Sequence, residues 1–262
     1  MTHVQVMVDG SMLTKEMILD SGALIYNGHR YHLEQLSYQA PVTGTIYGIL
    51  LNDKTFVNGM DDEFHQAPYN KPPRHPVMYI KPINTVNGHR KSIPMPKGEP
   101  VLEMNASIGM VLDKTASNVT VADALDHIAG YTIVNDVTIP HDHYHRPNIK
   151  NKVRDGFCPV GPWIVEKEAV SNPNDLILNV SVNGEVKQSI HTSDVNRKAA
   201  ELLLEVSAFM TLSKGDVLLL GIFDGAPHAE IGDKVQIQVD GIGTLENTIT
   251  TETDWIPGGG VS

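Results

Sequence analysis

Three histidines stand at alternate positions in His141-Asp142-His143-Tyr144-His145. If this segment is extended, the three imidazoles share one face, and such a group suits a softer metal such as zinc. No cysteine or further carboxylate is placed to complete a tetrahedral site. The alternative, which we favour, is a solvated loop or the edge of a lid over a pocket.

A second group of candidate functional residues, two cations and one carboxylate, lies in Lys152-Val153-Arg154-Asp155. The ammonium of Lys152 suits an enolate or a carboxylate, and the planar guanidinium of Arg154 suits the two oxygens of a carboxylate. Asp155 is placed to orient either cation. The alternative is an ion-pair network on the surface or at a subunit interface, and the residues alone leave both interpretations open.

Composition narrows the class of partner. The 262 residues hold 20 Lys plus Arg against 31 Asp plus Glu, a formal net charge of −11, with no basic run. Nucleic acid and anionic membranes are therefore not expected partners, whereas an anionic small molecule is compatible, because a pocket needs only a few local cations. A single cysteine, Cys158, no secretory leader and no long apolar run together predict a cytoplasmic protein.

The elements that must hold these residues are mostly strands. Thr45 to Leu51 is an apolar run of strand length, Leu176 to Val182 alternates before a turn at Asn183-Gly184, and Val235 to Val239 alternates again. The pattern predicts an α+β protein, mostly β with some helix. We expect a small N-terminal β-rich lobe over residues 1–42 and a main domain over residues 43–262.

Helices are few in the predicted fold. Thr192-Ser193-Asp194 is expected to cap the longest helix, in which apolar residues from Ala199 to Met210 recur at helical spacing. A shorter helix is predicted from Val119 to His127, with Thr120 as its cap. Residues 66–100 are rich in proline and predict a surface excursion that holds one short strand from Val77 to Ile80.

Several segments, in order, resemble the fumarylacetoacetate hydrolase superfamily. They are Lys114-Thr115-Ala116-Ser117-Asn118-Val119, Ala129-Gly130-Tyr131-Thr132 through Asn135-Asp136, Lys152-Val153-Arg154-Asp155-Gly156-Phe157-Cys158-Pro159, Val182-Asn183-Gly184-Glu185 through Thr192-Ser193-Asp194, Phe209-Met210-Thr211-Leu212 and Gly215-Asp216-Val217. The resemblance runs from about residue 43 to the C-terminus and implies the mixed β-roll of that family, usually in dimers or larger oligomers.

Within the family, Tyr79-Ile80-Lys81-Pro82-Ile83-Asn84-Thr85-Val86 and Tyr144-His145-Arg146-Pro147-Asn148-Ile149-Lys150 are similar to the N-terminal half or subunit of the isomerase/decarboxylases of 4-hydroxyphenylacetate catabolism. This similarity implies an enzyme acting on unsaturated 2-oxo or 2-hydroxy-diene dicarboxylic acids. Lys152 is then the expected catalytic residue, and Arg154 and Asp155 are the expected substrate ligands. A homodimer, or a hetero-oligomer with a homologous subunit, is the expected assembly.

The family holds a divalent cation with Glu-x-Glu on one strand and an Asp after the next. Asp136 matches that Asp, but the two glutamates fall on Asn105 and Ser107, which carry no charge. Glu103 lies on the same strand parity and is a candidate substitute. The resemblance therefore implies Mg²⁺ or another divalent cation, weakly held by Asp136 with help from Glu103, Asn105 and Ser107, and no organic cofactor.

Two more positions depart from the family pattern. Phe56 stands where several members have a histidine base, and Gly221-Ile222-Phe223 replaces Gly-Thr-Pro. These losses favour one alternative, a catalytically degenerate partner subunit of an active homologue. An acylpyruvase-like hydrolase is a further alternative. We rank it last, because this chain lacks the histidine that would act as the base to activate water.

Overall fold

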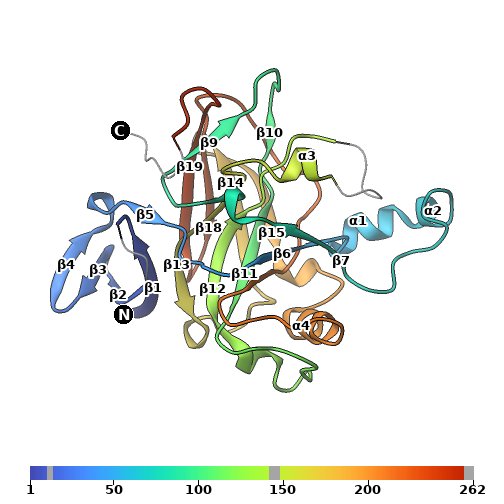
Figure 1. Cartoon of the computed structure of the whole chain (residues 1–262), viewed down its shortest axis with the longest axis horizontal. Coiled ribbons are helices and arrows are strands. Elements are labelled where there is room, and N and C mark those ends of the chain that lie inside the picture. The colour runs from blue at the N-terminus through green and yellow to red at the C-terminus, as the bar shows by residue number, and fades with distance from the viewer. Residues whose placement is uncertain (11–13, 142–147, 257–262) are drawn as a thin grey trace.

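The computed structural model describes residues 1–10, 14–141 and 148–256 of the chain. Over these ranges the chain is mostly β-structure with a few short helices, as predicted (Figure 1). A twelve-stranded sheet and a five-stranded sheet make up most of it. A further small sheet pairs β10 (Leu102–Glu103) with β17 (His228–Ala229).

The large sheet forms the body of the fold. Its strands are β1 (Thr2–Val8), β2 (Lys15–Asp20), β3 (Ala23–Tyr26), β4 (His29–His32), β5 (Tyr38–Gln39), β6 (Ile46–Leu50), β7 (Val77–Lys81), β8 (Val86–Asn87), β11 (Ala106–Leu112), β12 (Ile128–Asn135), β13 (Cys158–Glu166) and β16 (Val217–Leu219). The main path runs β4-β3-β2-β1-β13-β12-β11-β16-β6-β7. β11, β12 and β13 are buried almost throughout, which explains their nearly unbroken apolar sequences.

The second sheet confirms the predicted hairpin. Its strands, in spatial order, are β15 (Glu185–His191), β14 (Ile177–Val182), β18 (Lys234–Val239), β19 (Gly243–Thr251) and β9 (Ser92–Met95). Every second residue of β14 and β18 is buried, as the alternation predicts. Asn183 and Gly184 turn the chain with φ of 53° and 82°, a conformation that favours these two residue types.

The proline-rich excursion holds more structure than predicted. Besides β7, residues 66–100 contain β8 and β9, although Pro94 lies inside β9. β9 pairs only with β19, so Pro94 lies on an edge strand, where its missing N–H costs no ladder hydrogen bond.

The helices are α1 (Lys54–Gly59), α2 (Asp61–Phe64), α3 (Ile149–Lys152) and α4 (Ala199–Ser207). None of the helices in the described ranges is long and apolar enough to cross a membrane. The apolar face predicted for α4 is confirmed as far as Val206, with Leu202, Leu203 and Val206 fully buried, but the helix ends at Ser207, and Phe209 beyond it is exposed. Its predicted start was wrong, because Thr192–Asp194 forms a separate 3₁₀ turn.

Asn52 explains why α4 starts late. The backbone N–H of Asn196 donates to the Asn52 carbonyl at 2.7 Å, and that of Arg197 donates to the Asn52 side chain at 2.8 Å. These groups are therefore held by the end of β6 and cannot join a helix. The Glu201 carboxylate accepts a hydrogen bond from the backbone N–H of Lys198 at 2.9 Å and so caps the N-terminus of α4.

The helix predicted from Val119 to His127 is also largely wrong. Only a 3₁₀ turn over Ala124–His127 forms. In the segment just before this turn, the Asp123 carboxylate accepts from the N–H and the hydroxyl of Thr120, at 2.6 and 2.9 Å.

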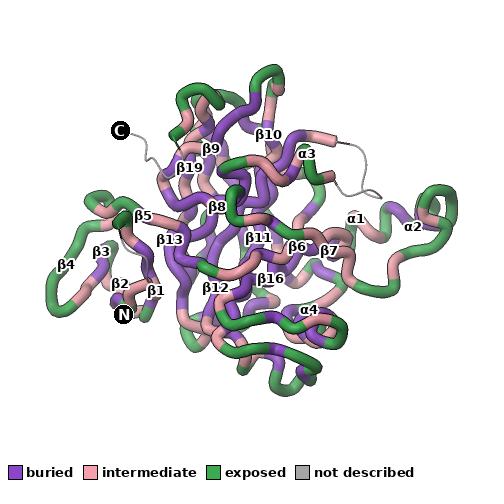
Figure 2. Tube along the Cα trace, viewed as in Figure 1, coloured by how far each residue is buried: buried purple, intermediate pink, exposed green. Residues whose placement is uncertain are grey.

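The predicted N-terminal lobe, residues 1–42, contains β1 to β5 and lies at one end of the molecule (Figure 1). β1 pairs with β13, so the strands of this lobe extend the large sheet. Every residue of β4 is exposed, whereas the central strands are buried (Figure 2). The division at residue 42 stays a prediction.

The different burial of Leu203 and Phe209 predicts different effects of alanine substitutions on the free energy of unfolding. Leu203 is 0% exposed and Phe209, just beyond the helix, is 62% exposed. We expect Leu203→Ala to lower the free energy of unfolding by about 2–5 kcal/mol, because it leaves a cavity, and Phe209→Ala to lower it by less than about 1 kcal/mol. Equilibrium urea unfolding measures both. Equal losses would show that α4 is not packed in this way.

Candidate functional site

A pocket of about 770 Å³ opens beside the ends of β6, β7 and β10. The start of α1, helix α3 and the loop after β16 complete its walls. This volume is in the range of sites that enclose small molecules.

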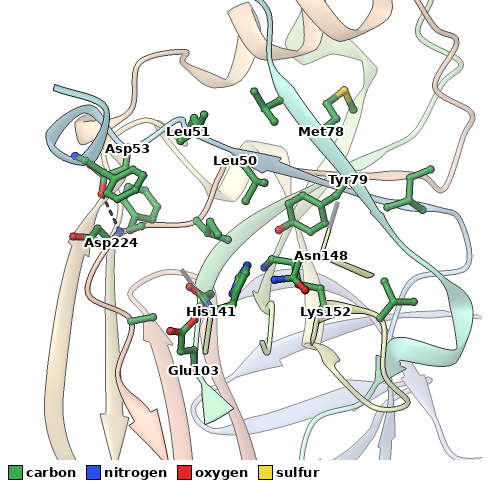
Figure 3. A pocket seen from close by; sticks show the side chains of 18 of the residues that line it. Leu50, Leu51, Asp53, Met78, Tyr79, Glu103, His141, Asn148, Lys152 and Asp224 are labelled. Carbon is green, nitrogen blue, oxygen red and sulfur yellow. Dashed lines mark hydrogen bonds between the residues drawn. The ribbon is translucent and has the colours of Figure 1, made fainter. Parts of the chain in front are cut away.

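Apolar side chains make most of the wall, among them Leu50, Leu51, Phe56, Ile80, Ile222 and Phe223. Figure 3 shows Tyr79 and Leu50 on one side, and a polar group on the side facing them that consists of Glu103, His141, Asn148 and Lys152. Asp53 and Asp224 lie at the far end, where the Asp53 carboxylate accepts the N–H of Asp224 at 3.0 Å. The pocket therefore combines an apolar wall with one polar side.

Behind the polar side lies a buried ion cluster, formed by Lys81, Asp136 and Lys152. The ammonium of Lys152 donates to Asp136 Oδ2 at 2.9 Å. Lys81 Nζ lies 2.7 Å from Asp136 Oδ1, an ion pair without hydrogen-bond geometry. The side chains of Lys81 and Asp136 are 0% exposed and that of Lys152 is 7% exposed, so only Lys152 reaches the pocket.

Each lysine is fixed by further oxygens. Lys152 also donates to Thr138 Oγ1 at 2.8 Å. Lys81 donates to the carbonyl of Lys152 at 2.7 Å and, more weakly, to that of Val137 at 3.4 Å. These bonds tie β7 to α3 and to the segment after β12, so the three charges are held by three separate parts of the chain.

Tyr79 completes the cluster by donating its hydroxyl to Asp136 Oδ2. Tyr79 lies on β7 opposite Gly48 of β6. A Cβ at position 48 would come within 2.0 Å of the Tyr79 ring. Gly48 therefore leaves the space in which the ring lies as its hydroxyl reaches Asp136.

The environment sets the protonation of the cluster. Burial raises the pKa of Asp136, but the charges of Lys152 and Lys81 and the hydrogen bond from Tyr79 outweigh it, so the pKa lies well below its usual value. Burial lowers the pKa of Lys152 and the charge of Lys81 lowers it further, against the opposing effect of Asp136. Burial, and then Asp136, raise the pKa of Tyr79 well above its usual value, so it remains a phenol donor.

Asn105 and Ser107, the positions of the absent glutamates, donate hydrogen bonds to main-chain carbonyls. The amide of Asn105 donates to the Asp136 carbonyl at 3.2 Å, and the hydroxyl of Ser107 donates to the Gly221 carbonyl at 2.6 Å. Glu103 lies on the pocket wall, 3.8 Å from His228. Burial raises the pKa of Glu103, against the effects of His228 and Lys152.

These residues do not fit a divalent cation. The Asp136 carboxylate, predicted as the surviving metal ligand, already contacts two ammonium groups. A hard cation needs several oxygen ligands, usually with more than one carboxylate. In the described part of the chain, no group of three His, Cys, Asp or Glu side chains is arranged to hold a metal ion.

Other predicted site residues are distributed differently. Arg154 and Asp155 are not among the residues that line the pocket. Arg154 donates back to the Lys150 carbonyl at 3.1 Å, and Asp155 accepts from Asn84 at 2.7 Å, so both make local contacts, and their role as substrate ligands stays a prediction. His141 lines the pocket, whereas His143 and His145 lie outside the described residues.

The structure also brings together most of the positions that depart from the family pattern. Phe56, Asn105, Ile222 and Phe223 all line the pocket, although they lie far apart in the sequence. Tyr79 and Lys81 were not predicted as site residues. Their spacing could have indicated that they act together, because residues two positions apart on a strand lie on the same face.

Replacing Asp136 by Asn tests the ion cluster. We expect the free energy of unfolding at pH 7 to fall by about 3–5 kcal/mol, because Lys81 and Lys152 lose the buried carboxylate that pairs with both of them. The folded-state pKa of Asp136 lies below the ordinary 3.8, so its stabilising effect is complete above pH 3.8 and is lost as the pH falls through the folded-state pKa. Urea unfolding of both proteins at pH 7, and of the wild-type chain at successive pH values below 3.8, measures the difference at pH 7 and its loss in acid. A loss below about 1 kcal/mol at pH 7 would contradict the cluster.

Comparison with known proteins identifies the family. Residues 45–250 match the family described as fumarylacetoacetate (FAA) hydrolase C-terminal. The 4-hydroxyphenylacetate degradation bifunctional isomerase/decarboxylase of Escherichia coli is 40% identical over 211 residues, which cover 80% of this chain and 48% of that protein. The chain thus spans about half the length of the first curated relatives that it matches.

Two further proteins extend the likeness over most of both chains. Oxaloacetate tautomerase YisK of Bacillus subtilis is 31% identical over 230 residues, which cover 84% of this chain and 75% of that protein. The crystal structure of 2-hydroxyhepta-2,4-diene-1,7-dioate isomerase from Mycobacterium marinum superposes with a TM-score of 0.76 and 27% identity, covering 96% of this chain and 99% of that one. The chain belongs to the fumarylacetoacetate hydrolase superfamily.

Proposed function

We propose that the pocket binds an unsaturated 2-oxo or 2-hydroxy-diene dicarboxylic acid of aromatic catabolism and interconverts its enol and keto forms. The observation that carries this proposal is a buried ammonium, Lys152, on the polar side of an otherwise apolar pocket. Names of relatives in the family, an isomerase/decarboxylase and a diene-dioate isomerase, support the same substrate class.

The charge of the ion cluster suits an anionic ligand. Two lysines and one aspartate leave a net charge of 2 − 1 = +1 when all three are ionised. In a site with little water, this charge acts strongly on an anion. A dienolate is such an anion, and its negative charge on the 2-oxygen forms only as the reaction proceeds, so stabilisation by Lys152 lowers the barrier.

The proton steps need one further group. Loss of the proton from the 2-hydroxyl of 2-hydroxyhepta-2,4-dienedioate gives the dienolate, and addition of a proton at C5 gives 2-oxohept-3-enedioate, so protons balance. Glu103 lies on the same wall, and its carboxylate would accept the proton from the 2-hydroxyl and then return it to C5. Burial raises the pKa of Glu103, which suits a carboxyl group that carries this proton between the two atoms. The apolar wall opposite would contact the carbon chain.

The same pocket would serve the decarboxylation of 5-oxopent-3-ene-1,2,5-tricarboxylate. Loss of CO₂ also leaves a dienolate, so the stabilising group, Lys152, is common to both reactions. We further propose that the chain works in the cytoplasm, as a homodimer or with a homologous subunit.

A second candidate is a catalytically degenerate partner of an active homologue. The neutral Asn105 and Ser107, and the chain's match to about half of the isomerase/decarboxylases, favour it. The acylpyruvase-like hydrolase is less favoured, because Phe56 on the pocket wall supplies no base for water. Co-purification with a homologue, together with no turnover by the isolated chain, would select the partner subunit.

Turnover of 2-hydroxyhepta-2,4-dienedioate by the purified chain tests the enzyme. We expect the ultraviolet absorbance of the dienol to decay faster than without protein, with Mg²⁺ and with EDTA alike. Lys152→Met should slow this decay by roughly 10²- to 10³-fold, because the enolate loses its cation. Exposed Lys150, on the same helix, gives the matched control, and Lys150→Met should change the rate less than about twofold.

Circular dichroism of each variant shows whether it is folded. An unchanged rate in folded Lys152→Met would remove Lys152 from the mechanism. No decay with the wild-type chain, in Mg²⁺ or in EDTA, would refute the isomerase and favour the partner subunit.

A further inference from the structure

We infer that this chain binds the 2-oxo acid without a divalent cation, and that Lys152, with Lys81 behind it, supplies the positive charge that a metal supplies at the family's usual site. The inference rests on the proposed function for its ligand class. It concerns how the ligand is held, and binding tests it separately from turnover.

The first step is the state of the Asp136 carboxylate. Its Oδ2 accepts hydrogen bonds from both Lys152 and Tyr79, and its Oδ1 lies 2.7 Å from Lys81 Nζ. A divalent cation bound to either oxygen would lie beside two ammonium charges of the same sign. Repulsion between charges at such short range in a buried site is strong, so the lysines exclude the cation.

The second step is the set of neighbouring oxygens. Asn105 and Ser107 are neutral, and their side-chain donors bind the carbonyls of Asp136 and Gly221. Glu103 is the only other carboxylate among the described residues on this side of the pocket, and it faces His228. One carboxylate would have to offset the charge of a metal in addition to the cluster's net positive charge, which is a poor site for a hard cation.

The third step is what Lys152 offers to a ligand. An ammonium has three donors, and the described residues use two of them, at Asp136 Oδ2 and Thr138 Oγ1. One donor remains on a group that lines the pocket. The Nζ atom also lies 4.9 Å from the centre of the Tyr79 ring, which helps to hold the charge in place.

Lys81 acts on the ligand only indirectly, through its charge, from a buried position behind Lys152. It is fully buried and bound to the Lys152 carbonyl, so it cannot touch a ligand in the pocket. Its charge nevertheless offsets that of Asp136, and the charge of Lys152 is left for the ligand. Without Lys81, Lys152 and Asp136 would form a neutral pair with no net attraction for an anion.

Isothermal titration calorimetry with 2-oxoadipate tests this inference. This saturated 2-oxo dicarboxylic acid offers the same carboxylate and 2-oxygen without the diene on which the proposed reaction depends. We expect the wild-type chain to bind it equally well, within about twofold, in EDTA and in Mg²⁺. Lys152→Met should weaken binding by roughly 10- to 100-fold, the value of one hydrogen bond to a charged group, and Lys150→Met should leave it unchanged.

Binding that disappears in EDTA and returns with Mg²⁺ would overturn the inference, and so would wild-type affinity in folded Lys152→Met. If Lys152→Met does not fold, electron paramagnetic resonance of Mn²⁺ added to the wild-type chain decides. We expect no binding tighter than about 1 mM, whereas micromolar binding would overturn the inference.

The two proposals fail in different ways. If 2-oxoadipate binds in EDTA but the dienol is not turned over, the enzyme is refuted and the cation-free site stands. If the dienol is turned over only with Mg²⁺, the enzyme stands and the cation-free site is refuted.

Discussion

The buried ion cluster of Lys81, Asp136 and Lys152 is the interaction on which the rest of this structure depends. Removing charges from water is costly, and a buried group of this kind persists only if each member has a partner. Here Asp136 contacts both lysines, and the lysines also donate to Thr138 and to main-chain carbonyls. The need to satisfy these charges fixes β7, α3 and the segment after β12 against one another.

The pocket takes its character from that arrangement. Because the side chains of Lys81 and Asp136 are sealed from the pocket, a ligand would meet an apolar cavity in which Lys152 is the one lysine or arginine that the described residues place on the wall. Phe56, Ile222 and Phe223 make the opposite walls apolar where the family pattern has polar or small residues. The change that removes the expected histidine base, at Phe56, and the changes at Ile222 and Phe223 therefore produce walls suited to the unsaturated carbon chain of the proposed dicarboxylic acid, one carboxylate end of which would lie at Lys152.

Much of the fold could be predicted, because it rests on local patterns. The alternation in β14 and β18 and the Asn183-Gly184 turn report directly on a half-buried hairpin. The start of α4 could not be predicted, because it depends on Asn52, which lies 145 positions from Arg197. The site shows the same limit: Lys152 was predicted, but the neighbouring Arg154 turns back to Lys150, and spacing alone does not tell which way such a side chain points. The sequence does not tell whether the Asp136 carboxylate binds a metal ion or pairs with lysines. Only the three-dimensional structure shows that its oxygens contact Lys81 and Lys152.

Diffraction data collected at the manganese absorption edge, from crystals grown with both Mn²⁺ and 2-oxoadipate, would test the central claim most directly. Our account predicts no anomalous peak at Asp136 and an oxygen of the ligand within about 3 Å of Lys152 Nζ. A manganese ion bonded to the Asp136 carboxylate, with Lys81 and Lys152 moved away from it, would contradict the account.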